Sequence, residues 1–259
     1  MKKKRLYTIL ILIFTGIFML GAFQIYRQLK EYGEGESSYT EIEQYVWVDE
    51  APEDSGDEEE NESQSGEGEP DLHWPAVDFD ALSEINPDIV AWIYIEDTEI
   101  NYPVVQGTDN QYYLKRLFNG KWNGSGCIFL DSRNSPDLSD RHSIIYGHHM
   151  KNGTMFSGLT EYKKQGFYEG HPVVLLMMPE QNVRVEIFAG YVASVQENAW
   201  EIELGSDVEF GEWLEEAKER SCFKSEITPA VTDRIVTLST CSYEFDNARF
   251  VLLGIMKEN

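Results

Sequence analysis

The chain of 259 residues carries 46 acidic and 21 basic residues, and its net charge of −25 is distributed unevenly. Residues 1–30 hold six basic and no acidic residues, residues 31–71 hold seventeen acidic and no basic residues, and residues 72–259 hold fifteen basic and twenty-nine acidic residues. This composition gives no basic surface for nucleic acid, so we expect no nucleic-acid partner. The three cysteines are too few for a disulfide scaffold.

The N-terminus combines a basic cluster, residues 2–5, with an uncharged stretch from Leu6 to Phe23. Its eighteen residues approach the roughly 20 that a helix needs to span the hydrocarbon core. A cleaved signal peptide has an apolar core of roughly 7–15 residues and a small-x-small cleavage site, so an uncleaved signal-anchor is favoured over a removed peptide. Because basic flanks stay cytoplasmic, residues 1–30 are expected to be a cytoplasmic stub and one span of the cell membrane, with the remaining chain outside the cell.

Residues 31–71 are rich in Glu, Ser, Gly and Asp, a composition that predicts an acidic disordered tether. Within it, residues 45–48 are interpreted as a short sticky or membrane-proximal patch. The globular body is expected from Leu72 to Asn259. Its predicted helices are a short one capped by Asp78 and ended at Asn86, one over residues 109–118, and one over residues 207–220 with apolar residues spaced i, i+3, i+4, i+7.

Strand-like apolar runs account for most of the remaining body. They cover residues 89–95, 100–105, 126–130, 142–146, 173–178, 183–194, 234–240 and 249–256. About eight strands in a body of this size predict a mainly β fold, a single closed eight-stranded barrel with peripheral helices.

Cys241 lies at the end of one such run, and Arg249 starts the next one after a short polar loop. If the two runs pair as an antiparallel hairpin, the thiol and the guanidinium face each other at one end of the sheet. The thiol is then a candidate nucleophile and Arg249 a candidate anion stabiliser. Cys127 is interpreted as a buried hydrophobe, and Cys222 has no evident partner.

A cysteine nucleophile needs a base, and the five histidines are the candidates. His73 and His171 are interpreted as surface residues, and His142 opens a strand. His148 and His149 close that strand, where a side chain reaches a cleft, and the residues alone leave the choice between them open. The histidine pair and the scattered cysteines lack the spacing of metal ligands, so no metal or cofactor is expected.

The segment Tyr146-Gly147-His148, followed by residues 237–241 (Thr-Leu-Ser-Thr-Cys) and Arg249, resembles the sortases, the cysteine transpeptidases of Gram-positive cell surfaces. The N-terminal helical extension, the helix at 207–220 and the stretches 101–106, 129–133 and 152–156 look like class B of that family. The resemblance implies a sortase-type barrel, with His148 rather than His149 as the family's histidine, Cys241 as nucleophile and Arg249 as its arginine. No calcium site is carried over.

The resemblance also implies a function. Cys241 would attack a C-terminal sorting signal and form a thioester, which an amine of a lipid-linked peptidoglycan precursor or of a pilin would resolve. Ser239 and Thr240 are expected to shape the substrate site through hydroxyl or backbone contacts. Two alternatives stay open: a cysteine hydrolase of the cell wall, and a tethered barrel that binds without catalysis.

Overall fold

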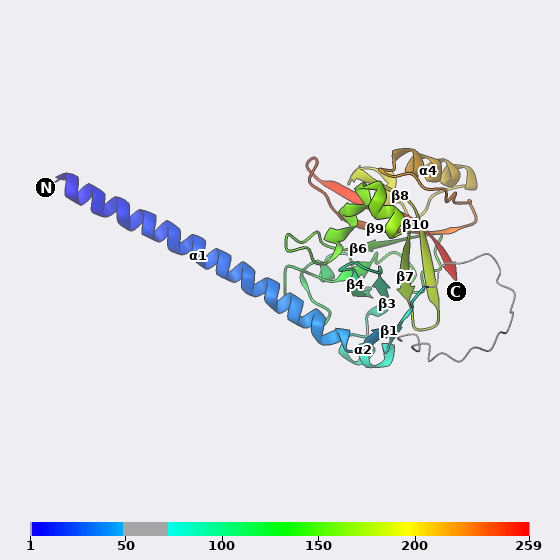
Figure 1. The fold of residues 1–259 in the computed structure, drawn as a ribbon, viewed down its shortest axis with the longest axis horizontal. Coiled ribbons are helices and arrows are strands. Elements are labelled where there is room, and N and C mark those ends of the chain that lie inside the picture. The colour runs from blue at the N-terminus through cyan, green and yellow to red at the C-terminus, as the bar shows by residue number, and fades with distance from the viewer. Residues whose placement is uncertain (1, 49–71, 259) are drawn as a thin grey trace, which may run out of the picture.

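The computed structural model describes residues 2–48 and 72–258, and its centre is a closed barrel in the strand order β10-β8-β7-β3-β4-β5-β6-β9 (Figure 1). The strands are β3 (Ile89–Tyr94), β4 (Asn101–Val105), β5 (Ile128–Leu130), β6 (His142–Tyr146), β7 (Val173–Met177), β8 (Asn182–Ser194), β9 (Arg234–Cys241) and β10 (Ala248–Glu258). Neighbours are antiparallel except for the parallel pairs β4–β5 and β6–β9. The predicted eight-stranded barrel is therefore confirmed.

Two apolar clusters hold the barrel together. The larger includes Trp92, Ile128 and Leu238, all at most 1% exposed. The smaller lies under α4 (Asp207–Arg220), whose buried residues contact β8, β9 and β10. The residues of α4 that are buried there are Phe210, Trp213, Leu214 and Ala217. A large side chain such as Phe210 or Leu214 contributes roughly 1.5–3 kcal/mol when fully buried, so this face fixes α4 on the barrel.

Two of the three predicted helices of the body form as expected. Helix α4 has the predicted bounds and begins with a reciprocal capping box between Ser206 and Glu209. Helix α2 (Phe79–Ile85) begins after Asp78, whose carboxylate accepts the backbone N–H of Ala81 at 2.9 Å. The remaining short helices are η2 (Phe156–Lys163), α3 (Gln165–Gly170) and η3 (Asn198–Trp200).

The helix predicted over residues 109–118 is wrong. Only η1 (Tyr112–Lys115), a 3₁₀ turn, forms there. The Asp109 carboxylate accepts the backbone N–H groups of Gln111 and Tyr112, which starts a tight turn, and Arg116 is already extended at φ −137°. Short polar side chains that bond the nearby backbone compete with helix formation in this way.

The N-terminal helix is longer than predicted, because α1 (Lys2–Glu43) continues through residues 31–43 of the expected tether. Composition alone suggested a solvated spacer, but Tyr39 and Ile42 are buried against the barrel, and this packing stabilises the helix. Strand β1 (Val46–Val48) then pairs with β2 (Pro75–Val77), so the patch at 45–48 belongs to a small sheet. The rest of the predicted tether, residues 49–71, lies outside the described residues.

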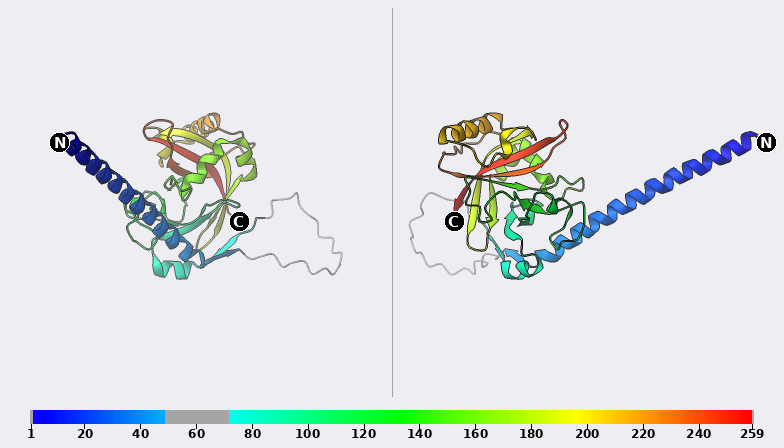
Figure 2. Two further views of the ribbon diagram at one scale, coloured as in Figure 1. Left: turned by 60° about the vertical axis from the view of Figure 1, so that its left-hand side comes forward. Right: turned by 180° about the vertical axis from the view of Figure 1, so that it is seen from behind.

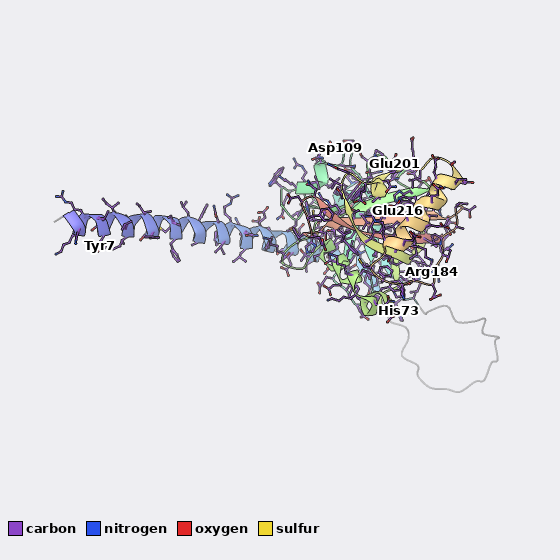
Figure 3. All side chains as sticks on the ribbon, turned by 90° about the horizontal axis from the view of Figure 1, so that it is seen from above. Tyr7, His73, Asp109, Arg184, Glu201 and Glu216 are labelled. Carbon is purple, nitrogen blue, oxygen red and sulfur yellow. The ribbon has the colours of Figure 1, made fainter. Side chains whose placement is uncertain are left out.

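Before it reaches the barrel, α1 projects away from it, and Tyr7 lies far out on this projection (Figures 2 and 3). By length and composition this helix is able to cross a membrane, and none of its most apolar window is buried. Its exposed apolar side chains agree with the predicted membrane span.

Candidate active site

The thiol and the guanidinium lie on neighbouring strands, as the sequence predicted. Cys241 is the last residue of β9, and Arg249 is its direct antiparallel partner on β10. The loop between them closes tightly, with the N–H of Ser242 bonded to the carbonyl of Ala248 at 3.0 Å. Arg249 donates from Nη1 to that same Ala248 carbonyl at 3.0 Å, which keeps the side chain folded at the hairpin.

The histidine reaches the same end of the barrel because β6 runs parallel to β9. The N–H of Gly147 continues this ladder to the carbonyl of Ser239 at 3.1 Å, and His148 follows directly. Position 147 must be glycine, since a Cβ there would lie 2.5 Å from Cδ1 of Ile128 and 2.6 Å from the ring of Phe156. The Gly-His sequence thus reflects a packing constraint that brings the strand end close to the core.

The two adjacent histidines have different surroundings. His148 Nε2 lies 2.7 Å from the carbonyl oxygen of Leu114, and because a carbonyl only accepts, Nε2 carries a proton. This leaves Nδ1 as the ring nitrogen available for proton exchange. His149 instead donates from Nδ1 to the carbonyl of Cys241 at 3.1 Å, so it holds the backbone of the strand end.

A cavity of about 470 Å³ joins the three groups. Its walls come from the η1 segment, β5, the end of β6, the connection after β8, and the β9–β10 hairpin. The lining residues are Asn110, Leu114, Phe129, Tyr146, Gly147, His148, Val195, Trp200, Ser239, Thr240, Cys241 and Arg249. His149 is not among them, which favours His148 as the residue that acts on a bound molecule.

Ser239 and Thr240 both line this cavity, but their hydroxyl groups are buried. The Ser239 hydroxyl accepts the indole N–H of Trp200 at 3.1 Å, which ties the wall after β8 to β9. The Thr240 hydroxyl has no hydrogen-bond partner among the described residues. Trp200 and Asn110 were not singled out from the sequence, since no spacing links their segments to the hairpin.

A buried carboxylate supports the wall formed by Tyr146 and Trp200. Burial by itself raises the pKa of Asp131, but hydrogen bonds from Arg133 and Tyr146 bring it down to about 2. Arg133 also donates to the carbonyl of Trp200 at 3.2 Å. Asp131 is therefore ionised at neutral pH. Its charge holds the Tyr146 hydroxyl directly and the Trp200 carbonyl through Arg133.

His142 is excluded as the base, because it is fully buried outside the cavity lining. Its ring lies 2.7 Å from the carbonyl of Glu201 and 2.8 Å from the Thr237 hydroxyl. Burial lowers the pKa of His142 to about 4, so the ring is neutral at pH 7. Its two hydrogen bonds connect the segment after β8, which contains Glu201, to Thr237 of β9.

The other cysteines have no catalytic setting. Cys127 is buried, and burial raises the pKa of its thiol to about 12, whereas Cys222 is exposed on the loop after α4. Among residues 2–48 and 72–258, no group of three or more His, Cys, Asp or Glu side chains could hold a metal ion.

A thiol, an imidazole and a guanidinium around one cavity define a cysteine enzyme equipped for acyl transfer. Residues 93–256 match the family model described as the sortase domain. The chain is 38% identical to sortase B of Listeria monocytogenes over 175 residues, 67% of this chain and 71% of that protein. It is 35% identical to sortase B of Staphylococcus aureus over 178 residues, 68% of this chain and 73% of that protein.

Solved structures of sortase B are similar to this chain over most of its length. Sortase B from Bacillus anthracis in complex with AAEK1 has a TM-score of 0.71 at 31% identity, covering 89% of this chain and all of that one. The Staphylococcus aureus sortase B-substrate complex has a TM-score of 0.66 at 34% identity, covering 70% and 84%. The chain therefore belongs to the sortase family of cell-wall cysteine transpeptidases, and to its class B. The family predicted from the sequence is confirmed.

Proposed function

We propose that this chain is a membrane-anchored transpeptidase that cleaves the C-terminal sorting signal of surface proteins and joins them to an amine. The observation that carries the proposal is the pairing of Cys241 with Arg249 beside a cavity that His148 also lines. The existence of a substrate complex of Staphylococcus aureus sortase B supports a peptide as the bound partner. The acceptor amine belongs to a lipid-linked peptidoglycan precursor or to a pilin.

In the first half-reaction, the Cys241 thiolate attacks the carbonyl carbon of a threonine in the signal, and a C–S bond forms. The negative charge moves to the carbonyl oxygen, where the positively charged guanidinium of Arg249 stabilises it. The C–N bond then breaks, the leaving amine takes a proton from Nδ1 of His148, and a thioester remains.

In the second half-reaction, Nδ1 of His148 takes a proton from the incoming amine, which attacks the thioester carbon. The C–S bond breaks, the Cys241 thiolate is restored, and a new amide forms. His148 can serve in both directions because its Nε2 stays bonded to the Leu114 carbonyl while Nδ1 exchanges the proton. Ser239 and Thr240 are proposed to contact the peptide through their backbone, since their hydroxyl groups are buried.

The anchor follows from α1. We propose residues 1–30 as cytoplasmic stub and membrane span, with the basic residues 2–5 on the cytoplasmic side and the catalytic body, residues 72–259, outside the cell. Protease added to intact cells should then remove the body and spare the N-terminal span.

The test of catalysis incubates the full chain in detergent micelles with a library of sorting-signal peptides and candidate amines. Intact-mass spectrometry should detect a thioester adduct on the wild type and on Cys222→Ala, the control thiol variant, but not on Cys241→Ala. Cleavage that is undiminished in Cys241→Ala would contradict the proposal. An added amine should divert the product from acid to amide, and a product that stays acid at every amine concentration would identify a hydrolase instead. A barrel that only binds would cleave no peptide.

A further inference from the structure

The loop that follows the catalytic histidine lies against the N-terminal helix. This loop, residues 150–152, comprises Met150, Lys151 and Asn152. It lines two hollows together with one face of α1, formed by residues 24, 25, 27, 28, 29, 31 and 32. Lys151 and Asn152 are exposed. The loop is thus at the same height along α1 as residues 24–32.

Hydrogen bonds fix the position of the barrel domain along α1. The backbone carbonyl of Glu31 accepts the side-chain amide of Asn123 at 2.8 Å, and the Glu31 carboxylate accepts the N–H of Gly124 at 2.6 Å. Further along the helix, the Tyr39 hydroxyl donates to the carbonyl of Gly126 at 2.5 Å. Because the contacts extend over two turns of α1, the barrel does not slide or swing freely along the helix.

The proposed span ends close to that height. Tyr7 and Tyr26 are nineteen residues apart in α1, or about 28 Å at 1.5 Å per residue. This separation matches a hydrocarbon core of about 30 Å, and tyrosines favour its two boundaries. Arg27 and Lys30 follow Tyr26 and suit the headgroup layer. The headgroups therefore begin at the part of α1 that the 150–152 loop faces.

The charge of this region suits anionic headgroups. Residues 142–160 contain Lys151 and no acidic residue, although the body as a whole has 29 acidic and 15 basic residues. The β9–β10 hairpin projects on the side toward which the N-terminal end of α1 points (Figures 1 and 2). The exposed aromatic residues Tyr243 and Phe245 lie in its loop.

We propose that the 150–152 loop rests on the lipid headgroups of the leaflet from which α1 emerges, with Lys151 on lipid phosphate. This inference depends on the proposed anchoring by α1. Since Met150 is two residues from His148, the active-site cavity then lies beside the membrane surface. A lipid-linked amine reaches the thioester there without leaving the bilayer.

The test places a nitroxide on the loop of the full chain through Asn152→Cys, in a Cys222→Ser, Cys241→Ala background, and keeps Lys151. The matched control carries the nitroxide at Glu216→Cys on α4, an exposed position on the side away from α1 (Figure 3). Each chain is reconstituted into phosphatidylglycerol or phosphatidylcholine vesicles that contain a lipid with a Ni²⁺-chelating headgroup. Lipid-bound Ni²⁺ should enhance spin relaxation severalfold at position 152 and leave position 216 unchanged. The enhancement should be greater with phosphatidylglycerol and should fall on Lys151→Glu.

Vesicle flotation separates the two ways in which the inference fails. A chain that does not float with the vesicles would overturn the anchoring by α1, and the docking with it. A chain that floats while position 152 is as insensitive to lipid-bound Ni²⁺ as position 216 would overturn the docking alone. Equal enhancement at both positions would also overturn it, because it would show a barrel without a fixed orientation.

Discussion

His148 donates from Nε2 to the carbonyl oxygen of Leu114 at 2.7 Å, and this bond leaves Nδ1 for the proposed proton exchange. His148→Ala should therefore lower kcat by about 10²–10⁴, the range typical of a lost general acid–base. His149→Ala removes one hydrogen bond to the Cys241 carbonyl, so its effect should stay within about tenfold. Steady-state transpeptidation of a fluorogenic signal peptide measures both. A larger loss in His149→Ala would reverse the assignment.

Gly147→Ala should damage both stability and activity. Its Cβ would meet Ile128 and Phe156 at 2.5–2.6 Å, so the strand end carrying His148 must shift. Overpacking of this kind costs roughly 1–3 kcal/mol of unfolding free energy. Gly166→Ala in α3 is the control, since a Cβ there meets no described atom within 4 Å. Urea unfolding compares the two variants, and equal stability would show that position 147 has room.

His142 should make stability depend on pH between about 6.5 and 4. Burial lowers the pKa of the folded-state imidazole to about 4 from 6.5, so the unfolded chain takes up the proton first. The contribution is fully present above pH 6.5 and is lost as the pH falls through 4, a loss of roughly 3 kcal/mol at 1.36 kcal/mol per unit.

The measurement is the unfolding free energy at pH 7, 5.5 and 4. His142→Gln should flatten this part of the profile, and His73→Gln, whose side chain is 48% exposed, should leave it unchanged. A profile that keeps its slope in His142→Gln would locate the titration elsewhere. Asp131 titrates in a separate window, since hydrogen bonds lower the pKa of that carboxyl to about 2.

The buried hydroxyl groups of Ser239 and Thr240 predict different effects on stability. Thr240→Val removes a hydroxyl without a partner among the described residues, so stability should be unchanged or slightly higher. Ser239→Ala leaves the Trp200 indole N–H without its acceptor and should cost about 1 kcal/mol. Thermal unfolding distinguishes the two. A rise in KM for Thr240→Val with unchanged stability would mean that the hydroxyl itself contacts the peptide.

Local patterns in the sequence were sufficient for several elements. The apolar spacing of α4 and the Asp78 cap of α2 are set within one or two helical turns, and both helices formed as predicted. The β9–β10 hairpin is also local, so the pairing of Cys241 with Arg249 followed from a short loop between two apolar runs.

Predictions failed at two segments, one because of distant packing and one because of a local turn. Residues 31–43 are acidic, yet Tyr39 and Ile42 find apolar partners on the barrel and the segment is helical. At Asp109 the carboxylate bonds the nearby backbone, and a turn forms in place of the predicted helix. The Leu114 carbonyl of this turn accepts the hydrogen bond of His148 Nε2. Neither the packing of Tyr39 and Ile42 on the barrel nor the His148–Leu114 hydrogen bond is visible as a spacing along the chain.

Local sequence patterns are enough to predict the Cys241 thiol at a strand end, the arginine opposite it and the apolar N-terminal helix, because each depends on neighbours within about twenty residues. The different hydrogen-bond partners of His148 and His149, and the presence of Trp200 and Asn110 at the cavity, depend on tertiary contacts. The physical reason is barrel closure: the parallel pairing of β6 with β9 joins segments nearly a hundred residues apart, and no local preference specifies that register.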